Sequence, residues 1–334
     1  MKVYFTLNND IEGNTIYMDM LRACLISAKK NTSLQLNAIY DGKESDKIYK
    51  ILIENDVNVI CHALSFYKEL EKFYDEKYKI SVNMKDMKLK QAACNFMKFE
   101  IPLYEKNDEI VLYSDIDILF LREPKLDDFY TKTLAAAPEF EQNYDIIKGY
   151  KYFNAGTMLI NVKELGKRRK ILLDMLNKKQ RPYQECWDQG FFNELYKNDF
   201  EELGTEYNWK PYWGINENAK ILHLHGWLKP QTYNGEEHIG ALLNRFPKAF
   251  EGYLCYFIKF YDILNKDSSI YIAKLASFLK NAQEDANIKR KYKFSTWFYY
   301  YIYTNFAKFQ NIVPIKQLFN YSKKKLQKKG ILSI

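Results

Sequence analysis

Hydrophobic and polar positions along the first 120 residues alternate between two kinds of pattern. Apolar runs of strand length occur at residues 3–7, 34–40, 57–61 and 110–113. Apolar residues at helical spacing occur between them, at residues 16–29, 47–55 and 90–103. Strand–helix alternation predicts a mostly parallel sheet with helices on both faces, and the uninterrupted run 110–113 is typical of a strand buried on both sides. Ligands of such sheets bind beyond the carboxyl ends of the strands.

The pattern becomes mixed after Pro124. Further short elements are expected at residues 134–137, 157–162 and 221–224 as strands and at 171–176 as a helix. From about Phe250 the chain turns helical, with one apolar stripe formed by Tyr253, Phe257, Tyr261 and Leu264. The pattern therefore predicts an α/β domain of residues 1–250 and a helical region of residues 251–334.

The composition excludes several classes of protein. With 334 residues, 47% of them apolar and 28% charged, the chain reads as a soluble globular protein rather than a disordered or fibrous one. Five cysteines without a CxxC pair indicate neither a zinc ribbon nor a disulfide framework, which favours a cytoplasmic location. The first apolar run ends at Asn8, too early for a signal peptide, and no apolar stretch approaches the ~20 residues that span a bilayer.

The positive charge is concentrated near the C-terminus. Residues 286–334 hold eleven Lys or Arg and no Asp or Glu, whereas residues 1–285 hold 39 basic and 42 acidic residues, a net charge of −3. Basic clusters at 289–293 and 323–329 flank the aromatic run 297–303. Bases interleaved with aromatics suit an anionic membrane surface. The alternatives are a helical cap packed on the main domain and, less favoured, nucleic-acid binding.

Two aspartates follow the strand predicted at 110–113. In an extended chain Asp115 and Asp117 project to the same side, and Ile116 projects to the other. Adjacent carboxylates repel each other unless a cation lies between them, and carboxylate oxygens suit Mg²⁺ or Mn²⁺. The pattern favours a divalent metal site, with a pair of solvated loop carboxylates as the alternative.

A second polar cluster follows the strand predicted at 221–224. Two of the four histidines, His223 and His225, fall there, followed by Gly226 and Lys229. An imidazole added to two carboxylates shifts the metal preference toward Mn²⁺. Gly226 would let the backbone approach a phosphate, and Lys229 could neutralise one. Read alone, the two histidines could also form a zinc pair or be hydrogen-bonded strand residues.

Three further segments carry chemistry-bearing side chains. Asn154-Ala155-Gly156 comes just ahead of an apolar strand, and Lys98 is a single cation on an otherwise apolar helix. Asp188-Gln189 opens a helical segment, where Asp188 could simply be the N-cap. Gln189 cannot ionise, so it is a poor base but a good hydrogen-bond partner. No GxGxxG or GxxxxGK motif occurs, so dinucleotide-fold and Walker-type phosphate binding are unsupported.

Taken in order, these motifs resemble glycosyltransferase family 8, the retaining sugar-nucleotide transferases. The resemblance covers residues 1 to about 230: the N-terminal strand with its Asn/Asp turn, the DxD at 115–117, the Asn154 and Asp188 segments, and the HxxGxxKP pattern at 223–230. It implies a GT-A fold, a mixed but mostly parallel sheet flanked by helices, with a helical C-terminal extension. It further implies a UDP-sugar donor, UDP-galactose or UDP-glucose, and a glycan or glycolipid acceptor, with no nucleic-acid partner.

The resemblance also implies roles for individual residues. Asp115, Asp117 and His223 would ligate Mn²⁺, or Mg²⁺, across the diphosphate, which Gly226 and Lys229 would hold. Other donor contacts are implied at Thr6, Asn8, Asp10, Lys98, Ser114, Ile116, Glu139, Asn154, Ala155, Gly156, Asp188 and Gln189. Three positions depart from the family. Lys98 stands where Arg is usual, Gln231 stands where Trp is usual, and His225 has no family role.

The implied mechanism is transfer with retention at the anomeric carbon. Because Gln189 is a feeble nucleophile, front-face attack by the acceptor hydroxyl is favoured, and Asp188 is the alternative covalent nucleophile. An inverting transferase, an idle nucleotide-sugar or carbohydrate-binding protein and a metal-dependent nuclease are the competing interpretations. The net-acidic first 285 residues disfavour the nuclease. The basic tail favours a surface glycan such as lipopolysaccharide or lipooligosaccharide as acceptor, at the inner face of the cytoplasmic membrane.

Overall fold

A computed structural model of the chain describes residues 1–78, 89–126, 129–139, 145–147, 150–182, 187–197, 199–226, 228–232 and 236–291. It forms two compact units. The first contains residues 1–211, 216–225 and 259–266, and the second contains 212–215, 226–258 and the chain from 267 onward. The basic aromatic tail from residue 292 lies outside the described residues. The predicted boundary at residue 250 and the membrane role of the tail therefore stay predictions.

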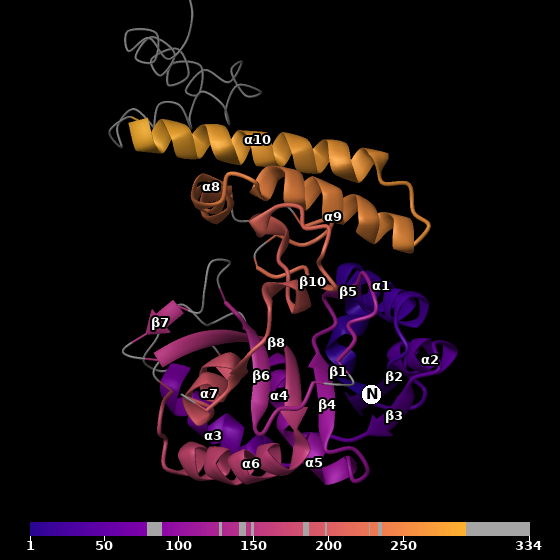
Figure 1. Cartoon of the computed structure of the whole chain (residues 1–334), viewed down its shortest axis with the longest axis vertical. Helices are drawn as coiled ribbons and strands as arrows, with labels where there is room; N and C mark the ends of the chain where they lie inside the picture. The colour runs from indigo at the N-terminus through magenta and orange to yellow at the C-terminus, as the bar shows by residue number, and fades with distance from the viewer. Residues whose placement is uncertain are drawn as a thin grey trace, which may run out of the picture. The chain divides into compact units, whose positions relative to one another are not determined.

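The first unit is built on one mixed sheet with the strand order β3-β2-β1-β4-β8-β6-β9 (Figure 1). Its parallel half consists of β1 (Lys2–Asn8), β2 (Gln35–Asp41), β3 (Asn58–Cys61) and β4 (Ile110–Ser114). These are the four apolar runs that predicted strands. Beyond β4, β8 (Tyr150–Asn161) runs antiparallel to β4, β6 (Leu134–Pro138) and β7 (Asp145–Ile147), and β9 (Glu201–Glu202) is parallel to β6.

Successive side chains of the central strands enter two hydrophobic clusters, one on each face of the sheet. Tyr4 and Val111 belong to one cluster, whereas their neighbours Val3, Phe5 and Leu112 belong to the other. The helices that contribute to the first cluster are α3 (Tyr67–Tyr78), α4 (Leu89–Phe96), α6 (Val162–Asn177) and α7 (Trp187–Leu195). Those that contribute to the second are α1 (Thr15–Asn31) and α2 (Lys47–Glu54). Burial on both faces explains why apolar residues predominate in these strands.

A separate two-stranded ribbon pairs β5 (Ile118–Phe120) with β10 (Ile221–His223) in antiparallel register. Strand β5 packs on α1. The sequence pattern predicted β10 but not β5, which is only three residues long. Short 3₁₀ turns complete the unit at η1 (Asn9–Gly13) and η4 (Thr205–Tyr207), and η5 (Pro211–Trp213) follows at its edge.

Three predicted elements differ from the structure. The helix expected at 171–176 begins nine residues earlier, at Val162, in α6. The single helix expected at 90–103 is divided into α4, the 3₁₀ turn η3 (Met97–Glu100) and α5 (Ile101–Tyr104). Pro102 has no N–H and its ring would clash with the carbonyl of Lys98 in a continuous helix, so the chain tightens before it. The strand expected at 157–162 starts seven residues earlier, at Tyr150, so that Asn154, Ala155 and Gly156 lie inside β8 rather than ahead of it.

Helices dominate the second unit and the segment that joins it to the first. They are α8 (Glu236–Arg245), α9 (Ala249–Ile263) and α10 (Ser269–Lys291), and α10 packs on α8. The predicted stripe is buried at Tyr253, Phe257 and Tyr261. Among the described residues, no helix is both long and apolar enough to cross a membrane.

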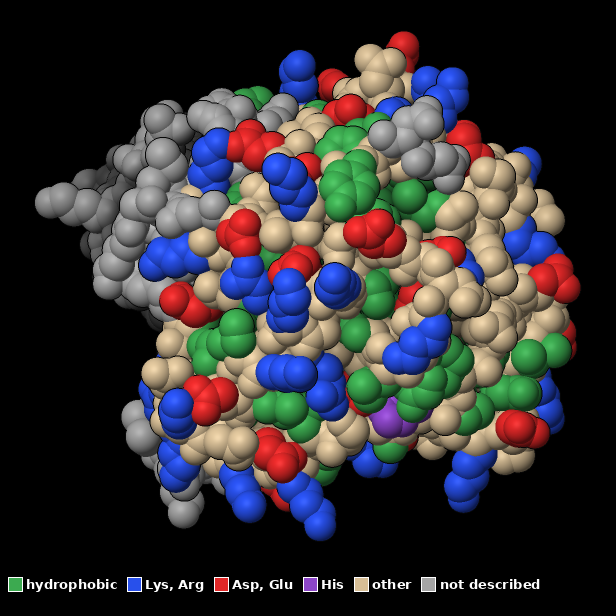
Figure 2. Space-filling model, turned by 60° about the horizontal axis from the view of Figure 1, so that its bottom comes forward, with side chains coloured by type: hydrophobic (Ala, Val, Ile, Leu, Met, Phe, Trp, Pro, Cys, Tyr) green, Lys and Arg blue, Asp and Glu red, His purple; other side chains and the backbone are tan. Residues whose placement is uncertain are grey.

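Charged side chains of both signs share the molecular surface. On the face shown in Figure 2, Lys and Arg are interspersed with Asp and Glu. Helix α6 illustrates this mixture, with the pairs Glu164–Lys167 and Asp174–Lys178 at helical spacing. Exposed pairs of this kind contribute little to stability, so the fold depends on the two apolar clusters instead.

Candidate active site

The aspartate pair lies where the sheet ends and the ribbon begins. Strand β4 stops at Ser114 and β5 starts at Ile118, so Asp115, Ile116 and Asp117 form the connection. The last pair of the β4–β8 ladder is Ser114 with Thr157, and the backbone N–H of Asp115 donates to the carbonyl of Gly156 at 2.8 Å. The connection is therefore held against β8 beyond the carboxyl end of a central strand, which is where the strand–helix pattern predicts a ligand.

Antiparallel pairing of the ribbon brings His223 to the same place. The register sets His223 opposite Ile118, the residue after Asp117, and the N–H of Leu224 donates to the Asp117 carbonyl at 2.8 Å. The imidazole Nε2 lies 3.2 Å from Oδ1 of Asp117. Residues more than 100 positions apart in sequence thus meet because two three-residue strands pair.

Asp115, Asp117 and His223 form a group that fits a divalent cation. Each offers one ligand atom, and these atoms all lie within 4.8 Å of one another. Two opposite ligands of an octahedral Mg²⁺ at about 2.1 Å would be ~4.2 Å apart, so only a small contraction is needed to close the set on an ion. Two carboxylates and one imidazole are donors that Mn²⁺ and Mg²⁺ accept.

A buried lysine neutralises the carboxylates on the inner side of this cluster. Lys98, in η3, is 2% exposed, and its ammonium donates to Asp188 at 2.7 Å and to the Ala155 carbonyl at 3.3 Å. It also lies 3.6 Å from Asp115 and 4.2 Å from the centre of the Tyr113 ring. Burial alone would lower the pKa of Lys98, but Asp188 and Asp115 outweigh it and the pKa is raised. Lys98 therefore stays charged.

The neighbouring carboxylate behaves differently. Burial raises the pKa of Asp188, although Lys98 opposes this effect. Asp188 is the second residue of α7 and not the residue before it, so its contact with Lys98, rather than an N-cap, accounts for its position.

An amide and carboxylate network extends along β8 from this point. Glu139 Oε2 accepts hydrogen bonds from Nδ2 of Asn154 at 2.8 Å and from Nε2 of Gln189 at 3.0 Å. Gln189 Oε1 accepts from Nδ2 of Asn154 at 3.1 Å and from the backbone N–H of Ala155 at 3.0 Å. Both ends of the Gln189 amide are therefore engaged, and its orientation is fixed.

Lys210 is the counter-ion of Glu139, and it was not singled out from the sequence. Its fully buried ammonium lies 3.6 Å from Oε1 of Glu139 and donates to the backbone carbonyls of Pro138 and Glu139. Burial alone would raise the pKa of Glu139, but Lys210, His225 at 3.6 Å and the hydrogen bonds from the two amides together outweigh it, and the pKa falls to about 2. Burial lowers the pKa of Lys210 to about 8. The aromatic neighbours Trp209 and Tyr212 were the available signal that this lysine is buried.

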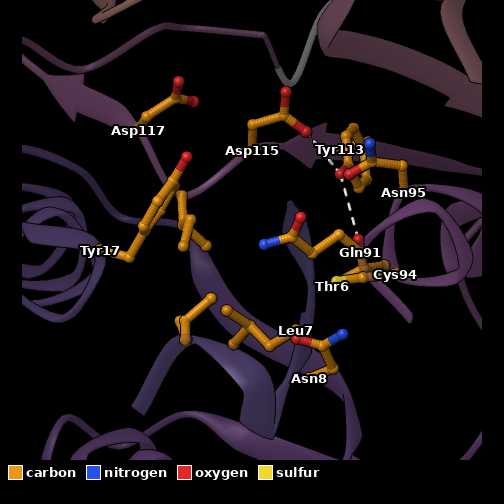
Figure 3. A pocket seen from close by; sticks show the side chains of 12 residues that line it. Thr6, Leu7, Asn8, Tyr17, Gln91, Cys94, Asn95, Tyr113, Asp115 and Asp117 are labelled. Atoms are coloured by element: carbon orange, nitrogen blue, oxygen red, sulfur yellow. Dashed lines mark hydrogen bonds between the residues drawn. The ribbon is translucent and has the colours of Figure 1, made fainter. Parts of the chain in front are cut away.

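A cavity of about 270 Å³ opens beside the aspartate pair (Figure 3). Its lining includes the predicted residues Thr6, Asn8, Asp115, Ile116 and Asp117, and also Leu7, Ile11, Tyr17, Gln91, Cys94, Asn95 and Tyr113. The Tyr113 hydroxyl donates to Oδ1 of Asp115 at 2.6 Å, so the Thr6 hydroxyl, 3.2 Å away, donates to Tyr113 in turn. Sequence reasoning missed Tyr17 of α1 and the α4 residues Gln91, Cys94 and Asn95. The sequence pattern of both helices is that of ordinary amphipathic helices.

Other predicted donor contacts lie outside the lining of this cavity. Asp10 is 3.8 Å from the ammonium of Lys90, and Ser114 is buried with its hydroxyl donating to the Asp115 carbonyl. Gly226, with φ +96°, and Lys229 belong to the second unit, so their assignment to the diphosphate stays a prediction.

Comparison with known proteins places the chain in a family. The sequence model described as glycosyl transferase family 8 matches residues 12–234, a span that includes the aspartate pair and His223. The chain belongs to glycosyltransferase family 8. The resemblance seen in the motifs and the prediction of a glycosyltransferase are thereby confirmed. No curated protein sequence matches the chain significantly.

Solved structures share the fold of this family 8 chain. The galactosyltransferase LgtC, determined with donor and acceptor sugar analogues, is 17% identical with a TM-score of 0.51, over 74% of this chain and 96% of LgtC. The apo form of the glycosyltransferase GlyE from Streptococcus pneumoniae TIGR4 is 18% identical with a TM-score of 0.51, over 83% of this chain and 63% of GlyE. These likenesses confirm the GT-A type fold, a mixed and mostly parallel sheet flanked by helices with a helical C-terminal region.

Proposed function

We propose that the chain transfers a hexose from a UDP-sugar to a hydroxyl of a glycan acceptor, with retention of configuration and with Mn²⁺ or Mg²⁺ bound. The convergence of Asp115, Asp117 and His223 beside a cavity carries this proposal. A divalent cation bound there would supply Lewis-acid stabilisation of the departing UDP. Family membership supports a nucleotide-sugar donor, and UDP-galactose and UDP-glucose are the first candidates.

Different residues of the site are assigned to the nucleoside, the diphosphate and the sugar of the donor. The cavity lined by Thr6, Asn8 and Tyr17 is the proposed place of the nucleoside, because it adjoins the aspartate pair and combines apolar with polar groups. We assign Gly226 and Lys229 to the diphosphate on the strength of the family motif alone. The donor sugar would contact Asn154, Asp188, Gln189 and Glu139.

The engaged amide of Gln189 supports front-face attack. Its Oε1 already accepts two hydrogen bonds, so neither lone pair is free to attack the anomeric carbon in this arrangement. The acceptor hydroxyl would attack on the face from which UDP leaves and pass its proton to the departing phosphate oxygen. Asp188, paired with Lys98, remains the second candidate nucleophile.

The composition of the tail supports a proposal for the acceptor and the location. We propose that residues 289–329, with their basic clusters and aromatic run, contact anionic lipids. This would place the enzyme at the inner face of the cytoplasmic membrane and makes a lipopolysaccharide, lipooligosaccharide or other surface glycan the preferred acceptor.

A donor screen tests the proposal. UDP-sugars are incubated with the chain with and without Mn²⁺, and UDP release is measured, since slow hydrolysis reports turnover even without the acceptor. We expect one UDP-hexose to be turned over in a metal-dependent manner, and Asp115→Ala to abolish it. NMR of the product distinguishes retention from inversion. Binding of UDP without turnover of any donor would favour an idle nucleotide-sugar-binding protein instead.

A further inference from the structure

The side-chain amide of Asn208 joins the metal-ligand candidate His223 to Asn154 on the proposed sugar side. Asn208 is 0% exposed. Its Oδ1 lies 2.9 Å from Nδ1 of His223, and its Nδ2 donates to Oδ1 of Asn154 at 2.8 Å. A fully buried amide that spans two site residues must satisfy its polar groups there, because leaving them unpaired would cost the full desolvation penalty.

Backbone pairing places Asn208 at this position. The next residue, Trp209, forms a parallel bridge with Leu222 of β10. The N–H of Trp209 donates to the Ile221 carbonyl, and the N–H of His223 donates to the Trp209 carbonyl at 2.7 Å. The segment before Lys210 therefore runs as a partial third strand beside β10, and its register holds the Asn208 amide against the imidazole.

The direction of each hydrogen bond is set by groups that can act in only one way. The ionised carboxylate of Glu139 can only accept, so the Asn154 atom that faces it is Nδ2. The backbone N–H of Gly156 can only donate, and it meets Oδ1 of Asn154 at 3.1 Å. Asn208 must therefore turn its Nδ2 toward Asn154, and its Oδ1 is left facing His223.

This orientation selects one tautomer of the imidazole. An amide oxygen accepts hydrogen bonds, so Nδ1 of His223 carries the hydrogen. In the neutral imidazole, which is the form that can bind a cation, Nε2 then keeps its lone pair. Nε2 is the atom that faces Asp117, and it is the nitrogen that a cation held by the aspartate pair would need.

We propose that Asn208 is a positioning residue that fixes the Nδ1–H tautomer and the ring orientation of His223, and so presents Nε2 to the divalent cation. Partners of this kind are the usual means by which proteins orient histidine ligands. The cation side of the inference rests on the proposed function. The same amide also supports Asn154, so Asn208 couples the metal ligand to the residues assigned to the sugar.

The test compares the Mn²⁺ affinity of the wild type with that of two Asn208 variants. The affinity is measured by electron paramagnetic resonance at pH 8 with UDP present. Asn208→Leu removes both hydrogen bonds and is expected to weaken Mn²⁺ binding by about tenfold or more. Asn208→Asp keeps an acceptor for Nδ1–H and should stay within about threefold of wild type in Mn²⁺ affinity. It should nevertheless lower kcat, because a carboxylate cannot donate to Asn154.

A matched control and an activity-independent measurement complete the design. Asn37→Leu removes another buried amide, bonded to Val3, Gln35 and Asn58, and should leave Mn²⁺ affinity unchanged. The ¹⁵N NMR spectrum of the histidine rings reads the tautomer directly, and the chain has only four histidines. It needs neither metal nor turnover, so it decides the tautomer even where Asn208→Leu fails to fold.

Three results would overturn the inference. These are an Nε2–H tautomer of His223 in the wild type, unchanged Mn²⁺ affinity in a folded Asn208→Leu, and an Asn208→Asp that loses as much affinity as Asn208→Leu. A wild type that shows the expected tautomer but neither binds Mn²⁺ nor turns over any UDP-sugar would instead reject the proposed function and the cation side of the inference, leaving the tautomer assignment established.

Discussion

The backbone of Gly156 lies directly against the imidazole of His223. A Cβ at position 156 would come within 2.3 Å of Cε1 and 2.8 Å of Nδ1, distances that real Cβ atoms do not tolerate. The glycine is thus required because the metal-ligand candidate occupies the space where any other side chain would begin, rather than for backbone flexibility.

Substitution of this glycine should therefore act on the cation site. In Gly156→Ala the ring must leave its present position beside Asp117, and we expect the affinity for Mn²⁺ to fall by about tenfold or more. Calorimetric titration measures it. Gly166→Ala is the matched control, because its Cβ would meet Pro102 at an ordinary 3.5 Å in helix α6, where alanine is the better helix former. Equal Mn²⁺ affinity in the two variants would contradict the prediction.

Gln189→Ala should slow the chemical step more than it weakens donor binding. The amide links Asn154, Ala155 and Glu139, so its loss disturbs the alignment at the proposed reacting centre. We expect kcat to fall by about tenfold or more, with a smaller change in the KM for the donor. Steady-state kinetics with the UDP-sugar found in the screen measures both, and an unchanged kcat would remove Gln189 from the reacting centre.

Lys210→Met should move the titration of Glu139 into a pH range in which the wild-type carboxylate does not titrate. The pKa of Glu139 is depressed to about 2, so its ionisation does not change between pH 5 and 8. As for any carboxylate with a lowered pKa, its stabilising contribution is complete above an unfolded-state pKa of about 4.3 and is lost as the pH falls toward 2.

Without Lys210, burial raises the pKa of Glu139 against weaker opposition, from His225 and from the hydrogen bonds of Asn154 and Gln189. We expect kcat of Lys210→Met to decline as the pH is lowered from 8 to 5, because protonated Glu139 no longer accepts from both amides. Lys210→Arg keeps a cation there and should show no such decline. A defect that is the same at every pH would indicate a packing role for Lys210.

Lys98→Met should destabilise the fold. The substitution leaves Asp188 buried without its cation, and breaking a buried pair from one side costs about 3–5 kcal/mol. Urea unfolding measures the free energy. Lys29→Met provides the comparison, because Lys29 and Asp56 form an exposed pair whose loss should cost less than about 1 kcal/mol. Similar losses in the two variants would mean that Asp188 finds another partner or takes up a proton.

The sequence predicted strands and helices well wherever burial produces a regular pattern of apolar residues. The parallel strands β1 to β4 and the helices α1 and α2 were predicted to within about two residues of their ends, because both faces of the sheet are covered and apolar residues predominate in the runs. Helix α3, with a polar segment at Lys68–Lys72, was missed. The division of the helix before Pro102 could have been expected from the proline alone.

The site was less accessible to sequence reasoning because its contacts join distant segments. The aspartate pair and His223 were singled out by residue type, but their approach depends on the β5–β10 register, which two three-residue strands do not reveal. Asn208 carried no signal of its role and Lys210 only that of its aromatic neighbours, since an isolated asparagine or lysine is usually exposed. Their burial follows from the bridge between Trp209 and Leu222.

The pairing of β5 with β10 has a further consequence for how the protein matures. The third candidate cation ligand is supplied more than 100 residues after the first two, so a nascent chain that has not yet reached β10 holds only the aspartate pair. High-affinity Mn²⁺ binding should therefore appear only after the ribbon has closed. During refolding it would serve as a late reporter of native topology, and added Mn²⁺ would favour chains that have completed this step.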